Sequence, residues 1–185
     1  MQVSILCGGK SSRMQSEKGL VLYKKKPFVE HIIEAVLPIS NNIQLVTNGN
    51  EYDYLGYKIV KDRIENKGPL GGIYSALLNS DSEINLILSC DIPLISTEIL
   101  SELIQKRNVD FDIAVFKDLD KIHPLIGIYS KKLVPVLKKA LDENELKMMD
   151  FISRNKHQLI PIEEKNRQLF RNINSREDLQ ELELT

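Results

Sequence analysis

The sequence predicts an α/β fold with a mostly parallel central sheet. Short apolar runs rich in β-branched residues alternate along the chain with longer amphipathic runs, an order typical of βαβ units. Several short runs end in glycine or polar residues, as strands do where they pass into ligand-binding loops. The length of 185 residues fits one domain with a sizeable core, spanning residues 1–185.

Five short runs are predicted to be strands because they are apolar and rich in valine and isoleucine. In chain order they are Val3 to Cys7, Ile43 to Thr47, Ile59 to Val60, Asn85 to Ser89 and Ile113 to Phe116. The polar segment 118–121 that follows the fifth run predicts a loop within the domain, and we do not expect a domain boundary there.

The longer runs repeat apolar residues at the period of an amphipathic helix. These predicted helices are Pro27 to Leu37, Gly72 to Leu78, Thr97 to Lys106, Lys131 to Leu141 and Lys147 to Ser153. Pro27 suits a first helical turn, and Ser96 suits an N-cap with Glu98 near the positive end of the helix dipole. Ser175 similarly begins a C-terminal helix that runs through Leu182.

Composition limits the classes of partner. The chain has 25 basic and 26 acidic side chains, so no global field favours nucleic acid or an anionic membrane, and an anion site must be local. Cys7 and Cys90 lie in apolar runs and form neither a disulfide framework nor a metal-binding C-x-x-C pair. Without a signal-peptide pattern or a membrane-length apolar run, we expect a protein of the reducing cytoplasm.

The ends of four predicted strands carry glycine or polar residues. They are Cys7-Gly8-Gly9, Thr47-Asn48-Gly49, Asp62 and Ser89-Cys90-Asp91-Ile92-Pro93. The carboxyl ends of parallel strands meet at one edge of a sheet, so we expect these segments to face a common crevice.

The glycine loop after the first strand is predicted to hold phosphate. Gly8 and Gly9 let backbone N–H groups approach a nucleotide, while Arg13 and Lys18 supply cations. The loop is not a P-loop, because Ser4 stands where the first glycine would be, and it does not complete the G-x-G-x-x-G pattern. A solvated basic turn is the structural alternative.

Asp91 is the candidate metal ligand. It follows a buried strand, and Mg²⁺ in nucleotide sites often takes only one or two carboxylates, with substrate phosphates as further ligands. An aspartate that only caps a turn before Pro93 is the alternative.

A third candidate segment is Gly68 to Gly72, which leads into a helix. Its glycines permit close packing against a base or ribose, and a helix N-terminus favours an anion. We therefore assign Asp62, Gly68 and Gly72 to the nucleoside, with an ordinary glycine-rich turn as the alternative.

Together these motifs resemble the molybdenum cofactor guanylyltransferases, within a nucleotidyltransferase group that has a Rossmann-like three-layer fold of the nucleotide-diphospho-sugar transferase type. The family's opening pattern L-A-G-G-x-x-x-R-M-G-x-D-K is similar to residues 6–18. Its G-P-L-A-G, C-D-x-P and N-x-N-T-x-x-D-L patterns are similar to residues 68–72, 90–93 and 172–179. The resemblance covers nearly the whole chain. Asn172 and Asn174 favour the guanylyl branch, because the cytidylyl branch resembles D-x-D-T there.

The resemblance implies an enzyme that transfers GMP from GTP to the terminal phosphate of molybdenum-loaded molybdopterin and releases pyrophosphate. It implies catalytic roles for Arg13, Lys18 and Asp91, with Mg²⁺ on Asp91 as the cofactor. The GTP-binding residues that it implies, together with the candidates above, are Leu6, Cys7, Gly8, Gly9, Lys18, Asn48, Asp62, Gly68, Gly72 and Asp91.

The acceptor site is expected in the second half of the chain. Similarity to late family segments implies that Lys147, Asn172 and Asn174 contact molybdopterin, so that residues 1–95 hold GTP and metal and residues 96–185 hold the acceptor. For Lys147 a solvated helix position is the alternative, and for Asn174 the alternative is a residue that only organises the turn before the Ser175 cap. The resemblance also implies transient contact with upstream cofactor-biosynthesis proteins and with recipient molybdoenzymes or chaperones.

Departures from the family pattern leave two other functions open. Gln15 replaces a glycine whose backbone freedom the phosphate loop could require. One alternative is a different nucleotidyl transfer, such as cytidylyl transfer to molybdopterin or to a sugar or alcohol phosphate. The other is a non-catalytic GTP-binding protein that delivers the cofactor.

Overall fold

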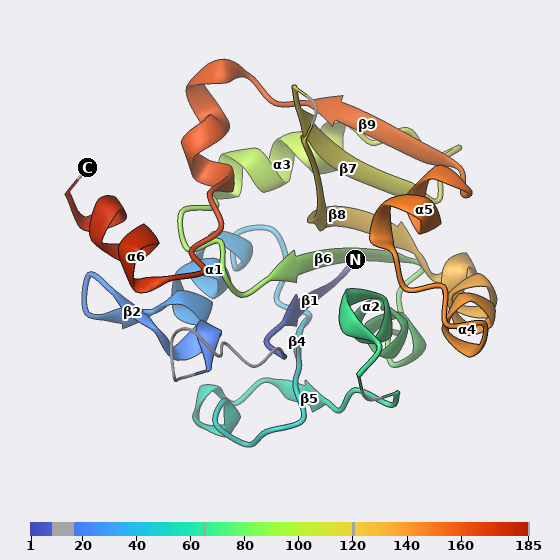
Figure 1. Cartoon of the computed structure of the whole chain (residues 1–185), viewed down its shortest axis with the longest axis horizontal. Coiled ribbons are helices and arrows are strands. Elements are labelled where there is room, and N and C mark those ends of the chain that lie inside the picture. Colours follow the sequence, from blue (N-terminus) through green and yellow to red (C-terminus); the bar gives the residue numbers. More distant parts are fainter. Residues whose placement is uncertain (9–16, 65, 120, 185) are drawn as a thin grey trace.

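A central sheet organises the chain in a computed structural model that describes residues 1–8, 17–64, 66–119 and 121–184 (Figure 1). Among these residues, seven strands form one sheet in the order β5-β4-β1-β6-β8-β7-β9. The strands are β1 Gln2–Leu6, β4 Ile43–Val46, β5 Lys58–Val60, β6 Ile84–Ser89, β7 Ile113–Asp118, β8 Lys121–Ser130 and β9 His157–Pro161. A separate hairpin pairs β2 Leu22–Tyr23 with β3 Lys26–Pro27.

The sheet is mostly parallel, as the sequence predicts. Strands β5, β4, β1 and β6 run parallel to one another, and β9 runs parallel to β7. Only β8 runs antiparallel to both of its neighbours, β6 and β7. All five residues of β1 are buried. Its two polar side chains are hydrogen-bonded, since Gln2 Nε2 donates to Asn42 O at 3.1 Å and Ser4 Oγ accepts from Gln44 Nε2 at 2.9 Å.

Helices cover both faces of the sheet and complete a three-layer α/β fold (Figure 1). One core cluster joins the sheet to α1 and α3, and a second joins it to α2, α4 and α5. The helices are α1 Phe28–Val36, α2 Gly68–Leu78, α3 Thr97–Lys106, α4 Val134–Asp142, α5 Met148–Ser153 and α6 Arg176–Glu183. Short 3₁₀ helices are η1 Lys18–Leu20, η2 Asp53–Leu55, η3 Lys131–Leu133 and η4 Glu164–Phe170.

Four helix starts differ from the prediction. Helix α4 begins at Val134, because residues 131–133 form the 3₁₀ helix η3, and α5 begins at Met148 and not at Lys147. Helix α2 begins at Gly68 and not at Gly72, because Pro69 occupies its first turn and Gly68 takes a φ of 59° that glycine tolerates. Helix α1 begins at Phe28, with Pro27 as the preceding extended residue. The caps predicted at Ser96 and Ser175 are present, since each hydroxyl accepts a backbone hydrogen bond in the first turn of its helix.

Strands β8 and β9 were not predicted. In β8, Pro124 interrupts a strand pattern because proline cannot donate to a ladder. The structure accommodates it at an irregularity, where pairing with β7 passes from Gly127 to His123, and pairing with β6 ends at Ile126. Pro124 therefore lies where neither neighbour requires its missing N–H.

The C-terminal segment returns to the N-terminal part of the chain. Ile173 and Leu182 pack with Tyr23 and Phe28 in a small apolar cluster. This contact places α6 beside the β2–β3 hairpin (Figure 1). Within the described part of the chain, no helix is both long and apolar enough to cross a membrane.

Candidate active site

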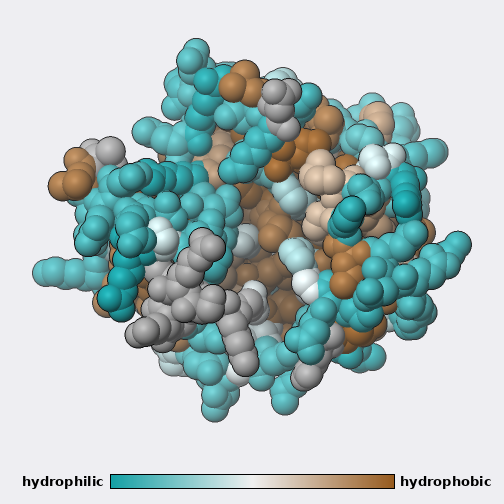
Figure 2. All heavy atoms as spheres, viewed as in Figure 1, coloured by the Kyte–Doolittle hydropathy of each residue, from teal (hydrophilic) through white to brown (hydrophobic). Residues whose placement is uncertain are grey.

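A pocket of about 620 Å³ lies at the carboxyl edge of the parallel strands, within the size range of small-molecule sites. Residues from the ends of β1, β4, β5 and β6 and from the first turns of α2 surround it. Its lining consists of Leu6, Gly8, Glu17, Val46, Thr47, Asn48, Gly49, Asp62, Asn66, Gly68, Pro69, Gly72, Ser89 and Leu125. Figure 2 shows that this face of the molecule is hollowed, with hydrophobic side chains at the bottom of the hollow and hydrophilic ones around it.

Most predicted nucleotide-binding residues meet at this pocket. Six of them line it, namely Leu6, Gly8, Asn48, Asp62, Gly68 and Gly72. Gly9, Arg13 and Gln15 belong to the predicted phosphate loop but lie outside the described residues. The crevice predicted from the strand ends is therefore present, although its phosphate loop is described only in part.

Cys7 faces away from the pocket. Its side chain is fully buried in the cluster that also contains Cys90 and Tyr52, and both cysteines are free thiols. A hydrogen bond with Cys90, followed by burial, raises the pKa of the Cys7 thiol well above its usual value. Cys7 thus remains protonated, and contact with a nucleotide would fall to its backbone.

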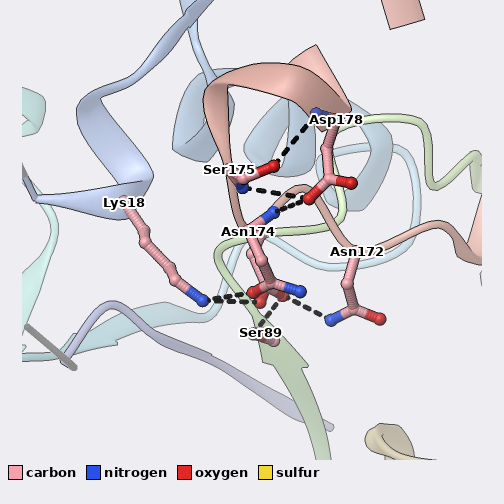
Figure 3. A network of polar contacts seen from close by, with 7 residues as sticks. Lys18, Ser89, Asn172, Asn174, Ser175 and Asp178 are labelled. Carbon is pink, nitrogen blue, oxygen red and sulfur yellow. Dashed lines mark hydrogen bonds and ion pairs between the residues drawn. The ribbon is translucent and has the colours of Figure 1, made fainter. Parts of the chain in front are cut away.

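Asp91 is the centre of a polar network beside the pocket (Figure 3). Its Oδ1 accepts hydrogen bonds from Ser89 Oγ at 2.6 Å and from Asn172 Nδ2 at 2.8 Å. Its Oδ2 lies 3.3 Å from Lys18 Nζ, which also donates to Asn174 Oδ1 at 2.5 Å. The Asp91 side chain is 8% exposed, so the carboxylate is stabilised mainly by these protein partners.

Lys18 reaches this network from η1, which packs tightly on the protein interior. A Cβ atom added to Gly19 would lie 2.7 Å from Tyr52 Oη and 3.3 Å from Cys90 Cβ. Only glycine permits this close approach. The glycine therefore lets the preceding lysine extend toward Asp91.

The segment that carries the two asparagines is anchored at Asn174 by the N-terminus of α6 and at Ile173 by the end of β6. Ser175 Oγ accepts from Asp178 N at 3.1 Å, and Asp178 Oδ2 accepts from the backbone N–H groups of Ser175 and Asn174 at 2.9 Å (Figure 3). These bonds form a capping box extended by one residue. The hydrogen bond from Asn174 N is the main reason why the pKa of Asp178 is lowered. Ile173 N donates to Asp91 O at 2.9 Å, which fixes the segment against the end of β6.

Asp62 and Asn48 both line the pocket and are joined by a hydrogen bond. Asn48 Oδ1 accepts from Asp62 N at 2.8 Å, so its amide NH₂ group remains as a donor for a ligand. Asp62 Oδ1 accepts from Ser75 Oγ at 2.9 Å and from Ile64 N at 3.3 Å. The sequence analysis missed Ser75, and only its position in a buried apolar run could have indicated a role. Ser89 was expected at the crevice with its strand end, and it lines the pocket, but its bond to Asp91 was not predicted.

Lys147 lines a different pocket. This cavity of about 510 Å³ lies between α4, α5 and the segment that joins them, and its lining includes Lys139, Phe151 and Arg154. Lys67 Nζ donates to Asn144 Oδ1 at 2.9 Å and so joins the N-terminus of α2 to this segment. The structure does not bring Lys147 together with Asn172 and Asn174, and its acceptor role stays a prediction.

The donor set around Asp91 fits a divalent metal that takes its other ligands from phosphates. Among the described residues, no group of three or more His, Cys, Asp or Glu side chains is arranged to hold a metal. Asp91 Oδ2 and Asn174 Oδ1 already share one cation, the ammonium of Lys18. One carboxylate with a neighbouring amide oxygen is sufficient for Mg²⁺ bound together with substrate phosphates.

At this edge of the sheet, the Lys18 ammonium and the buried Asp91 carboxylate lie beside a pocket within the size range of small-molecule sites. Together, fold and site define the class of nucleotidyltransferases. Residues 3–159 match the family model described as the MobA-like NTP transferase domain. With this match and with relatives that span nearly its whole length, the chain belongs to the molybdenum cofactor guanylyltransferase family.

Two relatives support this assignment, and one solved structure shares the fold. A probable molybdenum cofactor guanylyltransferase of Flavobacterium johnsoniae is 58% identical over 180 residues, with 97% of this chain and 95% of the relative covered. A protein of the same name from Carboxydothermus hydrogenoformans is 36% identical, with 98% and 94% covered. Molybdopterin-guanine dinucleotide biosynthesis protein A from Archaeoglobus fulgidus superposes with a TM-score of 0.85 at 23% identity, covering 100% and 97% of the two chains, and shows the same fold.

Proposed function

We propose that this nucleotidyltransferase transfers GMP from GTP to the terminal phosphate of molybdenum-loaded molybdopterin, with release of pyrophosphate. Relatives named molybdenum cofactor guanylyltransferase over nearly the full chain support this reaction. The observation that carries the proposal is the network in which the Lys18 ammonium contacts both Asp91 Oδ2 and Asn174 Oδ1, although Lys18 and Asn174 are 156 residues apart in sequence.

We assign the triphosphate to the end of the site marked by Lys18. An ammonium group there offsets phosphate charge, and Arg13, outside the described residues, is assigned to the leaving pyrophosphate. Enzymes of this family typically use a divalent metal, which we propose to be Mg²⁺ held by Asp91. The metal would supply charge neutralisation at the transferred phosphate.

We assign the nucleoside to the pocket beside this network. Leu6 and Gly8 would contact GTP through the backbone, as would Cys7 and the undescribed Gly9. Asn48 offers an amide donor, and Asp62 offers a carboxylate acceptor. Gly68 and Gly72, at the N-terminal turns of α2, permit close approach of the nucleotide.

We assign the acceptor to the side of Asp91 from which Asn172 and Asn174 approach. Their amides lie within hydrogen-bonding distance of Asp91 and Lys18, so an acceptor phosphate bound by them would lie close to the triphosphate. This arrangement supports a division of labour between residues 1–95 and 96–185, with Lys147 as a further candidate on the acceptor side.

The mechanism requires no dedicated general base. A phosphate monoester is largely ionised near pH 7, so the acceptor oxygen is already a nucleophile. The protein's contribution is to align this oxygen with the α-phosphorus and to reduce repulsion between two anions. We assign both needs to Lys18, because its ammonium contacts Asp91 and Asn174 at once.

The test is pyrophosphate release by the purified protein with Mg²⁺ and molybdopterin, using GTP, CTP, ATP and UTP in separate reactions. We expect release with GTP that depends on molybdopterin. Release with CTP alone would indicate cytidylyl transfer, and GTP binding without release would indicate a non-catalytic delivery protein.

We place the reaction in the cytoplasm, where free thiols such as Cys7 and Cys90 stay reduced. A product made there must pass to a recipient, so transient contacts with upstream biosynthetic proteins and with molybdoenzymes or their chaperones belong to the proposal.

A further inference from the structure

Helix α2 contains one buried polar side chain whose partners lie outside the helix. Ser75 is fully buried in a run of apolar residues. Its hydroxyl donates to Asp62 Oδ1 at 2.9 Å and accepts from Arg63 N at 3.0 Å. Both bonds point to the loop after β5, so the serine connects the helix to the loop that carries Asp62.

These bonds leave the two oxygens of Asp62 in different environments. Oδ1 accepts from Ser75 and from Ile64 N. Among the described residues, Oδ2 accepts no hydrogen bond, and Asp62 lines the nucleotide pocket. A carboxylate fixed through one oxygen presents the other in a defined direction at little entropic cost on binding.

We infer that Ser75 is a positioning residue for nucleotide binding, which acts by fixing the Asp62 carboxylate so that Oδ2 faces the nucleoside of GTP. Ser75 does not line the pocket, so it acts through Asp62 and not by contact with the ligand. The inference rests on the proposed function, because it assumes that this pocket binds GTP.

The Ser75 hydroxyl has a second partner, and this partner supplies the competing explanation. Because it accepts from Arg63 N, the serine could merely anchor the loop to α2. That bond does not involve the Asp62 side chain, so it persists when the carboxylate is removed. Combining substitutions at both residues therefore separates positioning of the carboxylate from anchoring of the backbone.

The experiment measures GTP affinity in the presence of Mg²⁺ by titration calorimetry for the wild type, Ser75→Ala, Asp62→Ala and the double variant. We expect Ser75→Ala to raise the dissociation constant about tenfold, the usual effect of losing a hydrogen bond to a charged group. Turnover at saturating GTP should stay within about twofold, because binding alone is affected. In the Asp62→Ala background, the same substitution should change affinity less than twofold.

A matched control is Ser80→Ala. Ser80 is also buried, and its hydroxyl accepts from Ser82 N at 3.0 Å and donates to Ser82 O at 3.3 Å, outside the pocket lining. It should lower the melting temperature without changing GTP affinity. Should Ser75→Ala not yield folded protein, Ser75→Cys nearly preserves the volume and removes most of the donor strength.

The outcomes separate the two proposals. If the wild type binds no GTP, the proposed function and the role of Ser75 both fail. If the wild type binds GTP but Ser75→Ala binds equally well, only the role of Ser75 is overturned. An equal loss of affinity in the wild-type and Asp62→Ala backgrounds would likewise overturn it and indicate loop anchoring.

Discussion

At the scale of single residues, Asp91 combines a structural and a chemical task. Its carboxylate accepts from Ser89, two residues before it, and from the distant Asn172, and it pairs with the distant Lys18. Such a group is preorganised for binding a cation, because the cost of ordering it is met during folding.

Asp91→Asn should abolish metal-dependent pyrophosphate release while the protein stays folded. The amide keeps the shape and one acceptor oxygen but loses the charge that holds a metal ion. We expect turnover to fall at least 100-fold, with the circular dichroism spectrum unchanged. Asp142→Asn is the control, because Asp142 pairs with Lys138 on the exposed face of α4 and turnover should be normal. If Asp91→Asn released pyrophosphate at the wild-type rate, the assignment of Asp91 as the metal ligand would be wrong.

His123 should make the fold sensitive to acid. The ring packs on Phe170 at 5.2 Å, and burial, with Lys121 nearby, lowers the pKa of His123 to about 4 although Asp118 opposes the shift. The unfolded chain binds this proton near pH 6.5. Above pH 6.5 the histidine is neutral in both the folded and the unfolded chain, and the fold has its full stability. As the pH falls toward 4, the unfolded chain takes up the proton first, so the free energy of unfolding decreases.

Urea unfolding of the wild type and of His123→Gln measures this effect. Between pH 7.5 and pH 4, the wild type should lose roughly 2 kcal/mol more stability than the variant. If the free energy of unfolding changed with pH in the same way in both proteins, the histidine would not be buried in its neutral form.

At the scale of elements, the N-terminus of α6 couples helix capping to the site. Ser175→Ala removes one bond of the capping box, which should cost about 1 kcal/mol of stability. Asn174 shares Asp178 with that box, so its amide should also lose its orientation toward Lys18. We expect the KM for molybdopterin to rise several-fold.

Ser96→Ala is the matched control for this prediction. Ser96 caps α3 through Ile99 N, in a helix that contributes no residue to the pocket lining. Both variants should melt at similarly reduced temperatures, and only Ser175→Ala should change the kinetics. If Ser175→Ala and Ser96→Ala had equal KM values for molybdopterin, the cap of α6 would not affect acceptor binding.

At the scale of the whole molecule, nucleotide binding should stabilise the fold. A ligand at about 100 times its dissociation constant adds about 2.7 kcal/mol to the folded state. For a chain of this length, GTP with Mg²⁺ should therefore raise the melting temperature by roughly 5 to 10 °C. Chelation of the metal should reduce the shift. An equal shift with CTP would contradict selectivity for guanine.

Much of this arrangement could be predicted from the sequence. The pattern of apolar runs indicated the parallel strands β1, β4, β5 and β6, and the residues that follow them do surround a pocket. These predictions succeed because they depend on local periodicity and on where strands end. Asp91 was a candidate for the same reason, since it follows directly after β6.

What the sequence did not predict depends on contacts between distant residues. Strand β8 tolerates Pro124 only because its neighbours leave that position unpaired. Ser75 and Asp62 are brought together by the packing of α2 on the loop after β5, and no local pattern encodes their hydrogen bond. Lys147 and Asn172 are likewise placed by distant contacts, because Lys147 lines the pocket between α4 and α5 whereas Asn172 donates to Asp91.

The return of the C-terminal segment to Asp91 has a consequence for the order of events during synthesis. The parallel strands β1, β4, β5 and β6 are complete once residue 89 has been made, but Asn172 and Asn174 come more than eighty residues later. A ribosome adds roughly 5 to 20 residues per second, so several seconds separate the two events. During this interval a nascent chain has all the pocket-lining residues except Leu125 but lacks the asparagines beside Asp91. With the proposed acceptor role of Asn172 and Asn174, transfer to the acceptor has to wait until the segment before the last helix has been made.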